Sequence, residues 1–152
     1  MMIREKLIRD EVIVCIVGLG YVGQPLAEAF SKSQKIIGFD VEENKIRKLN
    51  ETSSNNNITY TTDPSLIEQA DFIITAVPTP VTKSKEPDLS YVKSAAETIG
   101  KNMKKGSVVV LESTVYPGVT EEIVKPILEE ESRMKCGGKF QDWLLARENK
   151  SC

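Results

Sequence analysis

The sequence predicts an α/β protein in which a doubly wound parallel sheet is covered by helices on both faces. Three observations support this prediction. Short runs of β-branched residues alternate along the chain with segments of helical periodicity, and such alternation is typical of βαβ units with right-handed crossovers. The continuous apolar run Val12–Val17 fits a strand that is buried on both faces. The 152 residues suffice for one domain of ordinary size.

Four segments are expected to form the strands because each is short, apolar and rich in β-branched residues. The first ends at a glycine, and the third is stopped by Pro78, which cannot donate to a β-ladder. In chain order the expected strands are Val12–Val17, Ile36–Asp40, Asp71–Val77 and Ser107–Leu111. The segments 53–57 and 81–87 are polar and are expected to be loops.

The segments between these strands carry apolar residues at helical spacing, as Ile46 and Leu49 do. Proline suits the first turn of two of these helices, at Pro25 and Pro64, and Asp63 suits the N-cap of the second. The expected helices are Gln24–Lys32, Glu42–Asn50, Pro64–Gln69, Leu89–Met103 and a last one from Pro117 or Gly118 to Glu131.

The composition excludes several classes of function. Hydrophobic residues make up 40% and charged residues 28% of the chain, which is typical of a globular protein. A net charge of −2 gives no basic surface for nucleic acid, and no apolar run approaches the roughly 20 residues of a membrane span. The chain has no histidine, so Ser-His-Asp and Cys-His catalysis and the usual zinc enzymes are excluded within it, and no metal site is predicted.

Residues 1–11 are expected to be an N-terminal extension, because they alternate charged and apolar residues and lack the apolar core of a signal peptide. Cysteine usage favours a reducing cytoplasm, since Cys15, Cys136 and Cys152 show neither an even count nor CxxC spacing. Cys15 lies within a strand and is expected to pack in the core. Neither of the other two cysteines has a basic neighbour in a site that would mark a catalytic thiolate, so both are expected to be incidental.

A GxGxxG motif directly follows the first expected strand and opens the next helix, which is the context that makes this pattern informative. In a dinucleotide-binding, Rossmann-type fold the first glycine makes a tight turn, the second lets the backbone approach a pyrophosphate, and the third lets the helix pack close to the strand. The helix N-terminus adds N–H groups and a partial positive charge. The alternative is a purely structural glycine turn. The residues of the motif are Gly18, Leu19, Gly20, Tyr21, Val22 and Gly23.

An acidic residue ends the second expected strand. Asp40 follows Gly23 by 17 residues, close to the spacing of about 20 at which dinucleotide-binding folds place the acid that binds the adenosine ribose. A carboxylate repels a 2′-phosphate and no arginine immediately follows, so the sequence favours NAD over NADP as the cofactor. Lys45 is expected either to lie over the adenine or ribose or to be a solvated helix lysine.

Two further strand ends carry polar or conformationally restricted residues, and ligands of open α/β sheets gather at the carboxyl ends of the strands. The hydroxyls there are expected to bind ribose, carboxamide or a reacting oxygen, or simply to cap the following helix. After the third strand come Val77, Pro78, Thr79 and Pro80, where two prolines stiffen the loop. After the fourth come Ser113, Thr114 and Val115.

Four sequence motifs point to one enzyme family. They are GLGYVGQPL beginning at Gly18, AVPTP at Ala76, EPDLS at Glu86 and ESTVYPGVTEE at Glu112. Together, over residues 12–136, they resemble the N-terminal NAD-binding domain of the UDP-glucose/GDP-mannose dehydrogenase family. The EPDLS and ESTVYPG motifs are most similar to the UDP-N-acetylhexosamine 6-dehydrogenases. The NAD-binding domain is expected to span residues 12–138.

This resemblance implies an enzyme that oxidises the C6 hydroxyl of a UDP-sugar to a carboxylate in two steps, with two NAD. It assigns the cofactor contacts to Gly18–Gly23, Asp40, Lys45, the loop Val77–Val81 and Ser113–Val115. The family more often has arginine where Lys45 stands. The resemblance also matches Thr114 to a threonine that, in the family, helps to position the catalytic water or a substrate oxygen.

The same resemblance implies that this chain alone is catalytically incomplete. The nucleophilic cysteine of the family, with its assisting lysine and aspartate, belongs to a later domain, and neither Cys136 nor Cys152 is expected to replace it. Full-length members form homo-oligomers through a central helix that this chain lacks. One alternative is a stand-alone NAD-binding module without chemistry. Another is a different dehydrogenase with the same N-terminal fold, such as the 6-phosphogluconate group, against which the ESTVYPG motif argues.

Residues 139–152 do not continue the pattern of the family. One permitted codon choice for this segment, read one base later, encodes NFKIGYSPERINP, and members of the family have GYSPERINP at this place. The single tryptophan codon, at Trp143, fixes the glycine of that motif. The tail is therefore expected to be frameshifted, with Trp143 and Leu144 poorly buried or disordered. The alternative is a native amphipathic C-terminal helix.

Overall fold

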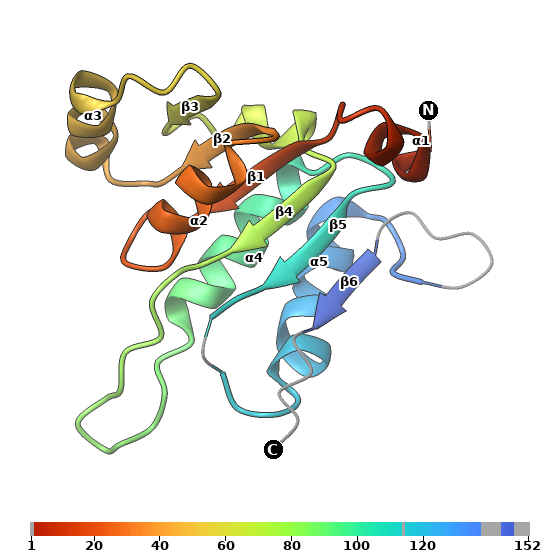
Figure 1. Ribbon diagram of the computed structural model, residues 1–152. Helices are drawn as coiled ribbons and strands as arrows, with labels where there is room; N and C mark the ends of the chain where they lie inside the picture. Colours follow the sequence, from red (N-terminus) through yellow and green to blue (C-terminus); the bar gives the residue numbers. More distant parts are fainter. Residues whose placement is uncertain (1, 114, 138–143, 148–152) are drawn as a thin grey trace.

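The computed structural model describes residues 2–113, 115–137 and 144–147, which form a parallel sheet between two layers of helices (Figure 1). The order of the strands across the sheet is β3-β2-β1-β4-β5-β6, and every neighbouring pair is parallel. The strands are β1 (Ile13–Val17), β2 (Lys35–Phe39), β3 (Ile58–Thr61), β4 (Phe72–Thr75), β5 (Val108–Leu111) and β6 (Leu144–Arg147).

This strand order is that of a doubly wound Rossmann-type sheet, as the sequence predicts. The direction of winding reverses between β1 and β4, so the topological switch point lies at their carboxyl ends. The helices are α1 (Ile3–Ile8), α2 (Gly23–Phe30), α3 (Glu43–Thr52), the 3₁₀-helix η1 (Pro64–Gln69), α4 (Ser90–Asn102), the π-helical turn η2 (Thr120–Val124) and α5 (Lys125–Ser132).

Each face of the sheet has its own apolar cluster. Alternate residues of β1 point to opposite faces. Val14 and Ile16 pack with α2 and α3, whereas Cys15 and Val17 pack with η1, α4 and α5. Cys15 has no exposed surface, which confirms that it is a core residue. The continuous apolar run of β1 is therefore explained by burial on both faces.

Strand β3 was not predicted. β3 alternates buried Ile58 and Tyr60 with the exposed Thr59, because it is the edge strand beyond β2 and only one of its faces is packed. Four residues with two threonines among them give a weak apolar signal, and the polar loop that precedes them makes it weaker. The strand matters for the site because it holds β2 on its outer side.

The N-terminal extension contains a short helix that sequence analysis did not predict. Lys6 of α1 reaches the buried carboxylate of Asp71, with Lys6 Nζ 2.7 Å from Oδ1. The same carboxylate oxygen lies 3.0 Å from Lys104 Nζ, and Oδ2 accepts the N–H of Ile13 at 3.0 Å. Asp71 thus joins α1, β1 and the turn after α4 at the amino ends of the strands, opposite the predicted cofactor site.

Several element boundaries differ from those predicted. The third predicted strand ends at Thr75 rather than Val77, although the N–H of Ala76 still donates to Val17 O at 2.8 Å. The last helix begins with a π-helical turn at Thr120, not at Pro117 or Gly118. Gly118 has φ +95°, a left-handed conformation that a continuous α-helix does not accommodate, so the helix starts only after it.

In the tail, Leu144–Arg147 form β6 and pair in parallel with Val108–Leu111. These four residues are therefore not part of an amphipathic helix. Leu144 pairs with Val108 in this strand, and the expectation that it is disordered remains a prediction. Its expected poor burial and the expectation for Trp143 lie outside the described residues. Whether the tail comes from a frameshift is not tested by the fold, and this remains a prediction.

Among the described residues, no helix has both the length and the apolar character that a bilayer crossing requires. The same ranges contain no cluster of three or more Cys, Asp or Glu side chains arranged to hold a metal ion.

Candidate cofactor site

The predicted cofactor residues come from four different parts of the chain and meet at one edge of the sheet. They follow β1, β2, β4 and β5, and the arrowheads of these neighbouring parallel strands all end at the same side of the molecule (Figure 1). The switch point between β1 and β4 lies in the middle of this edge.

Two glycines of the motif are required by close packing. Gly18 has φ +97°, and a Cβ there would lie 2.7 Å from the carbonyl oxygen of Ala76. A Cβ on Gly23 would lie 1.7 Å from the carbonyl oxygen of Gly18, because the first turn of α2 crosses directly over the end of β1. The predicted roles of these two glycines, a tight turn and a close helix–strand contact, agree with this geometry.

The middle glycine faces open space. A Cβ on Gly20 would have no heavy atom within 4 Å, and Gly20 is exposed. The following residues are exposed as well, with Tyr21 fully exposed and Val22 53% exposed. The fold itself therefore does not require a glycine at position 20. The turn presents its main chain and the N-terminus of α2 to solvent, and a pyrophosphate needs such a surface.

Leu19 takes part through its backbone only. Its side chain is 2% exposed and belongs to the core cluster under α2 and α3. Its N–H donates to Asp40 Oδ2 at 3.0 Å, which ties the glycine turn to the end of β2. Leu19 thus holds Asp40 in place, and its side chain does not reach the open edge.

Asp40 is the most strongly constrained polar residue of the site. It lies directly after β2 and is 9% exposed. Besides the Leu19 N–H, its carboxylate accepts the N–H of Glu42 on Oδ1 at 3.0 Å and Lys45 Nζ on Oδ2 at 3.0 Å. Burial alone would raise the pKa of Asp40, but the two backbone donors and the Lys45 ammonium together hold that pKa below its ordinary value. The carboxylate is therefore ionised at neutral pH.

Lys45 is not a solvated helix lysine. Its side chain is 33% exposed, and Nζ lies 3.0 Å from Asp40 Oδ2 and 3.4 Å from Glu42 Oε2. Burial lowers the pKa of Lys45, and the two carboxylates outweigh this and raise it. Sequence analysis did not single out Glu42. Its position three residues before Lys45 on the same helix start was the available signal.

The loops after β4 and β5 are joined by a hydrogen bond from Ser113 Oγ to the carbonyl oxygen of Val77, 2.8 Å long. The next helical turn begins only at Thr120, so Ser113 does not cap a helix and that alternative is wrong for this residue. Because the hydroxyl proton is used by Val77, the remaining capacity of Ser113 Oγ is as an acceptor. A ribose hydroxyl or a carboxamide N–H₂ is a suitable donor for it.

The other predicted residues of these loops differ in exposure. Pro78 and Pro80 are exposed and Thr79 is half-buried. Val77 and Val115 are partly buried and pack against the apolar cluster under α4, so they contribute packing as well as backbone. Thr114 lies outside the described residues, and its predicted assisting role remains a prediction.

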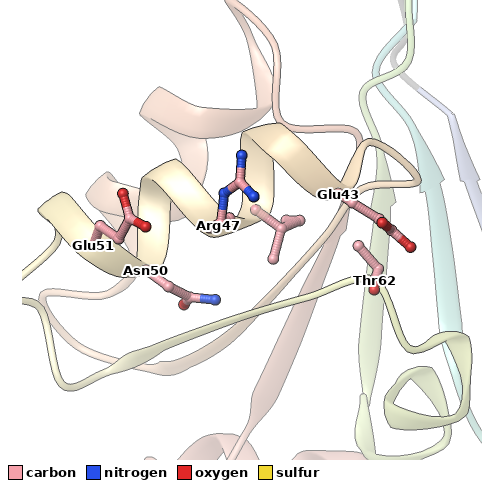
Figure 2. A pocket seen from close by; sticks show the side chains of 6 residues that line it. Glu43, Arg47, Asn50, Glu51 and Thr62 are labelled. Atoms are coloured by element: carbon pink, nitrogen blue, oxygen red, sulfur yellow. The ribbon is translucent and has the colours of Figure 1, made fainter.

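A cavity of about 480 Å³ lies beside the site, between the exposed face of α3 and the chain after β3. Figure 2 shows Glu43 next to Thr62 at one end of it and Glu51 at the other. None of the predicted cofactor residues lines it. No sequence signal pointed to this cavity, because five of its lining residues lie on α3 and only the fold brings Thr62 beside them. The lining residues are Glu43, Ile46, Arg47, Asn50, Glu51 and Thr62.

Comparison with known proteins agrees with this geometry. Residues 12–143 match the NAD binding domain of the UDP-glucose/GDP-mannose dehydrogenase family. Protein CapL of Staphylococcus aureus is 46% identical over 138 residues, which are 84% of this chain and 32% of CapL. The UDP-N-acetyl-D-glucosamine 6-dehydrogenase of Salmonella typhi is 42% identical over 143 residues, which are 86% of this chain and 34% of that enzyme. The chain thus spans about a third of the length of these relatives.

Solved structures of such enzymes have the same fold. A GDP-mannose dehydrogenase from Pseudomonas aeruginosa superposes with a TM-score of 0.81 at 28% identity, over 88% of this chain and 35% of that one. An NDP-N-acetyl-D-galactosaminuronic acid dehydrogenase from Methanosarcina mazei superposes with a TM-score of 0.80 at 33% identity, over 98% of this chain and 38% of that one. The chain belongs to the UDP-glucose/GDP-mannose dehydrogenase family and corresponds to its domain for NAD.

Proposed function

We propose that this chain is the NAD-binding part of a nucleotide-sugar 6-dehydrogenase that oxidises the C6 hydroxyl of a UDP-N-acetylhexosamine to a carboxylate. The substrate class is supported by relatives named as UDP-N-acetyl-D-glucosamine 6-dehydrogenase and UDP-N-acetyl-D-mannosamine dehydrogenase. The chain covers only about a third of them, so the activity is that of a longer protein. Alone, the chain binds NAD and does not complete the reaction.

The observation that carries this proposal is that the open glycine turn and the ionised Asp40 lie at adjacent strand ends and are tied together by the Leu19 N–H. The pyrophosphate binds over Gly20 to Val22 at the N-terminus of α2. The adenosine ribose donates to Asp40. The loops joined by Ser113 and Val77 hold the nicotinamide half of the cofactor, with Ser113 Oγ as an acceptor.

The oxidation of an alcohol to a carboxylate removes four electrons and consumes one water. NAD, when bound, accepts two electrons at a time, so two molecules are used in succession. Within this chain the residues bind and orient the cofactor, and Thr114 assists by positioning a water or a substrate oxygen. The buried Cys15 cannot act as the nucleophile, because burial raises the pKa of its thiol to about 12 and keeps it protonated.

The location and assembly of the complete protein follow from the same proposal. It acts on a UDP-sugar in the cytoplasm, forms homo-oligomers through a part outside this chain, and contacts neither nucleic acid nor membrane. The alternative of a stand-alone NAD-binding module shares every feature of the site. The two differ in whether coding sequence for a further domain follows.

Titration of the 152-residue chain with NADH, followed by isothermal calorimetry, tests the proposal. We expect saturable binding of one NADH per chain. We also expect no NADH production when the chain is mixed with NAD⁺ and UDP-N-acetylglucosamine. A folded chain that does not bind NADH contradicts the proposal for the site, and steady turnover contradicts the proposal that the chain is catalytically incomplete.

A further inference from the structure

The carboxylate expected to bind the ribose is already largely occupied by protein donors. Oδ2 of Asp40 accepts both the Leu19 N–H and the Lys45 ammonium, and Oδ1 accepts only the N–H of Glu42. Since each carboxylate oxygen has about two acceptor positions, one position on Oδ1 remains for a ligand hydroxyl. The second ribose hydroxyl must then accept from Lys45 or displace it. Lys45 is thus the cation next to the ribose position.

A lysine in this place is a partner for a 2′-phosphate as well as for a hydroxyl. NADP-binding members of this fold class use a nearby cation to hold the additional phosphate. If Asp40 were the only carboxylate paired with Lys45, their two charges would cancel and the ribose position would be locally neutral. A second carboxylate changes this balance, because Glu42 Oε2 lies 3.4 Å from Lys45 Nζ. The three side chains together carry a formal charge of about −1 at neutral pH.

We propose that Glu42 is a specificity residue that excludes NADP by drawing the positive charge of Lys45 toward itself and leaving the ribose position negative. This inference rests on the proposed NAD site and adds a second determinant to Asp40. Asp40 is buried and bound by backbone donors, so it also shapes the turn. The Glu42 side chain is 60% exposed and makes no helix-capping hydrogen bond, so it can be changed without disturbing the fold.

The experiment compares the affinity of the 152-residue chain for NADH and NADPH before and after Glu42→Gln and Glu42→Lys, at low ionic strength. A 2′-phosphate carries nearly two negative charges, so removing the negative charge beside Lys45 is expected to tighten NADPH binding about five- to tenfold for Glu42→Gln, and more for Glu42→Lys. NADH binding is expected to change less than about twofold, because the ribose hydroxyl is neutral.

Glu43→Gln is the matched control. Glu43 is the next residue of the same helix start, is exposed and undergoes the same change of charge, but its side chain lies beside Thr62 at the cavity (Figure 2). We expect it to change the ratio of the two dissociation constants less than about twofold. Circular dichroism verifies that each variant is folded, and Glu42→Gln alone is decisive if the lysine variant does not fold.

The outcomes separate the two proposals. If NADH binds and Glu42→Gln leaves the NADPH-to-NADH ratio unchanged, or if Glu43→Gln shifts it equally, Glu42 is not a specificity residue and the NAD site stands. If the folded wild-type chain binds neither nucleotide, the proposed site itself is wrong and the inference is overturned with it.

Discussion

At the scale of single residues, the three glycines of the turn differ in whether the packing of the fold requires them. Gly18 and Gly23 have backbone oxygens within 2.7 Å of where a Cβ would lie, whereas Gly20 has nothing within 4 Å. The first two are therefore needed by the fold. The fold would accept any small residue at Gly20, so we propose that the ligand explains the glycine there.

We predict that Gly20→Ala leaves the free energy of unfolding within about 0.5 kcal/mol of wild type and weakens NADH binding at least about tenfold, because the methyl group lies where the pyrophosphate approaches. Gly18→Ala is expected to cost more than about 2 kcal/mol, since backbone atoms must move at a left-handed position. Urea denaturation and NADH calorimetry on both variants check this. Unchanged NADH affinity of a folded Gly20→Ala chain would place the pyrophosphate elsewhere.

Residue types and spacing predicted the glycine turn and the place of Asp40 at the end of β2, because both have strict local requirements. The contacts of Ser113 and Lys45 could not be predicted. Ser113 bonds a carbonyl 36 residues away in the chain, and only the tertiary fold shows that its proton is used by Val77. The sequence of the helix is equally compatible with a solvated Lys45, and only the fold shows its ion pairs with Asp40 and Glu42.

At the scale of elements, Asp71 connects three of them. It accepts hydrogen bonds from the β1 backbone and from Lys6 and Lys104, and its side chain is 6% exposed. Burial raises its pKa, and the Ile13 N–H and the two lysines outweigh this and lower it. Its contribution to stability is therefore complete above the pKa of an unfolded aspartate, about 3.9, and is lost as the pH falls through the lower folded value.

We predict that Asp71→Asn lowers the free energy of unfolding by about 1–3 kcal/mol at pH 7, because two lysines then face a buried neutral amide. The difference from wild type should shrink as the pH falls below about 4. Asp63→Asn is the control, since asparagine replaces aspartate well as the N-cap of η1 and a change within about 0.5 kcal/mol is expected. Urea denaturation at pH 7 and near pH 3 measures both; equal stabilities of the two variants would contradict the role of Asp71.

The burial of each element also explains whether the sequence could predict it. β1, β2, β4 and β5 are inner strands with nearly uninterrupted apolar residues, and their helices have clear apolar faces. The edge strand β3 and the six-residue α1 lack these signals. α1 has no buried residue and is attached through the ion pair of Lys6, which no local pattern reveals.

At the scale of the whole molecule, the chain covers about a third of its relatives and its tail departs from the family pattern, so we make a prediction about the gene. The prediction is that the DNA after the codon of Gly137 encodes the GYSPER motif in the shifted frame and continues into a domain with the nucleophilic cysteine. Sequencing several hundred bases beyond the codon of Cys152 checks this. Unrelated sequence there would make residues 139–152 native and favour the stand-alone module. Restoring the frame is expected to restore oxidation of the UDP-sugar.

In the proposed site, NAD binds across the strand ends with its ribose on Asp40. The most direct measurement is NADH calorimetry on the wild-type chain and on Asp40→Asn, with Asp63→Asn as a control of equal charge change. Asp40→Asn is expected to weaken NADH binding at least about tenfold, because a charge-assisted hydrogen bond to the ribose is lost, while the control binds as wild type does. Equal binding by a folded Asp40→Asn chain would show that the ribose does not lie on Asp40 and would contradict the account.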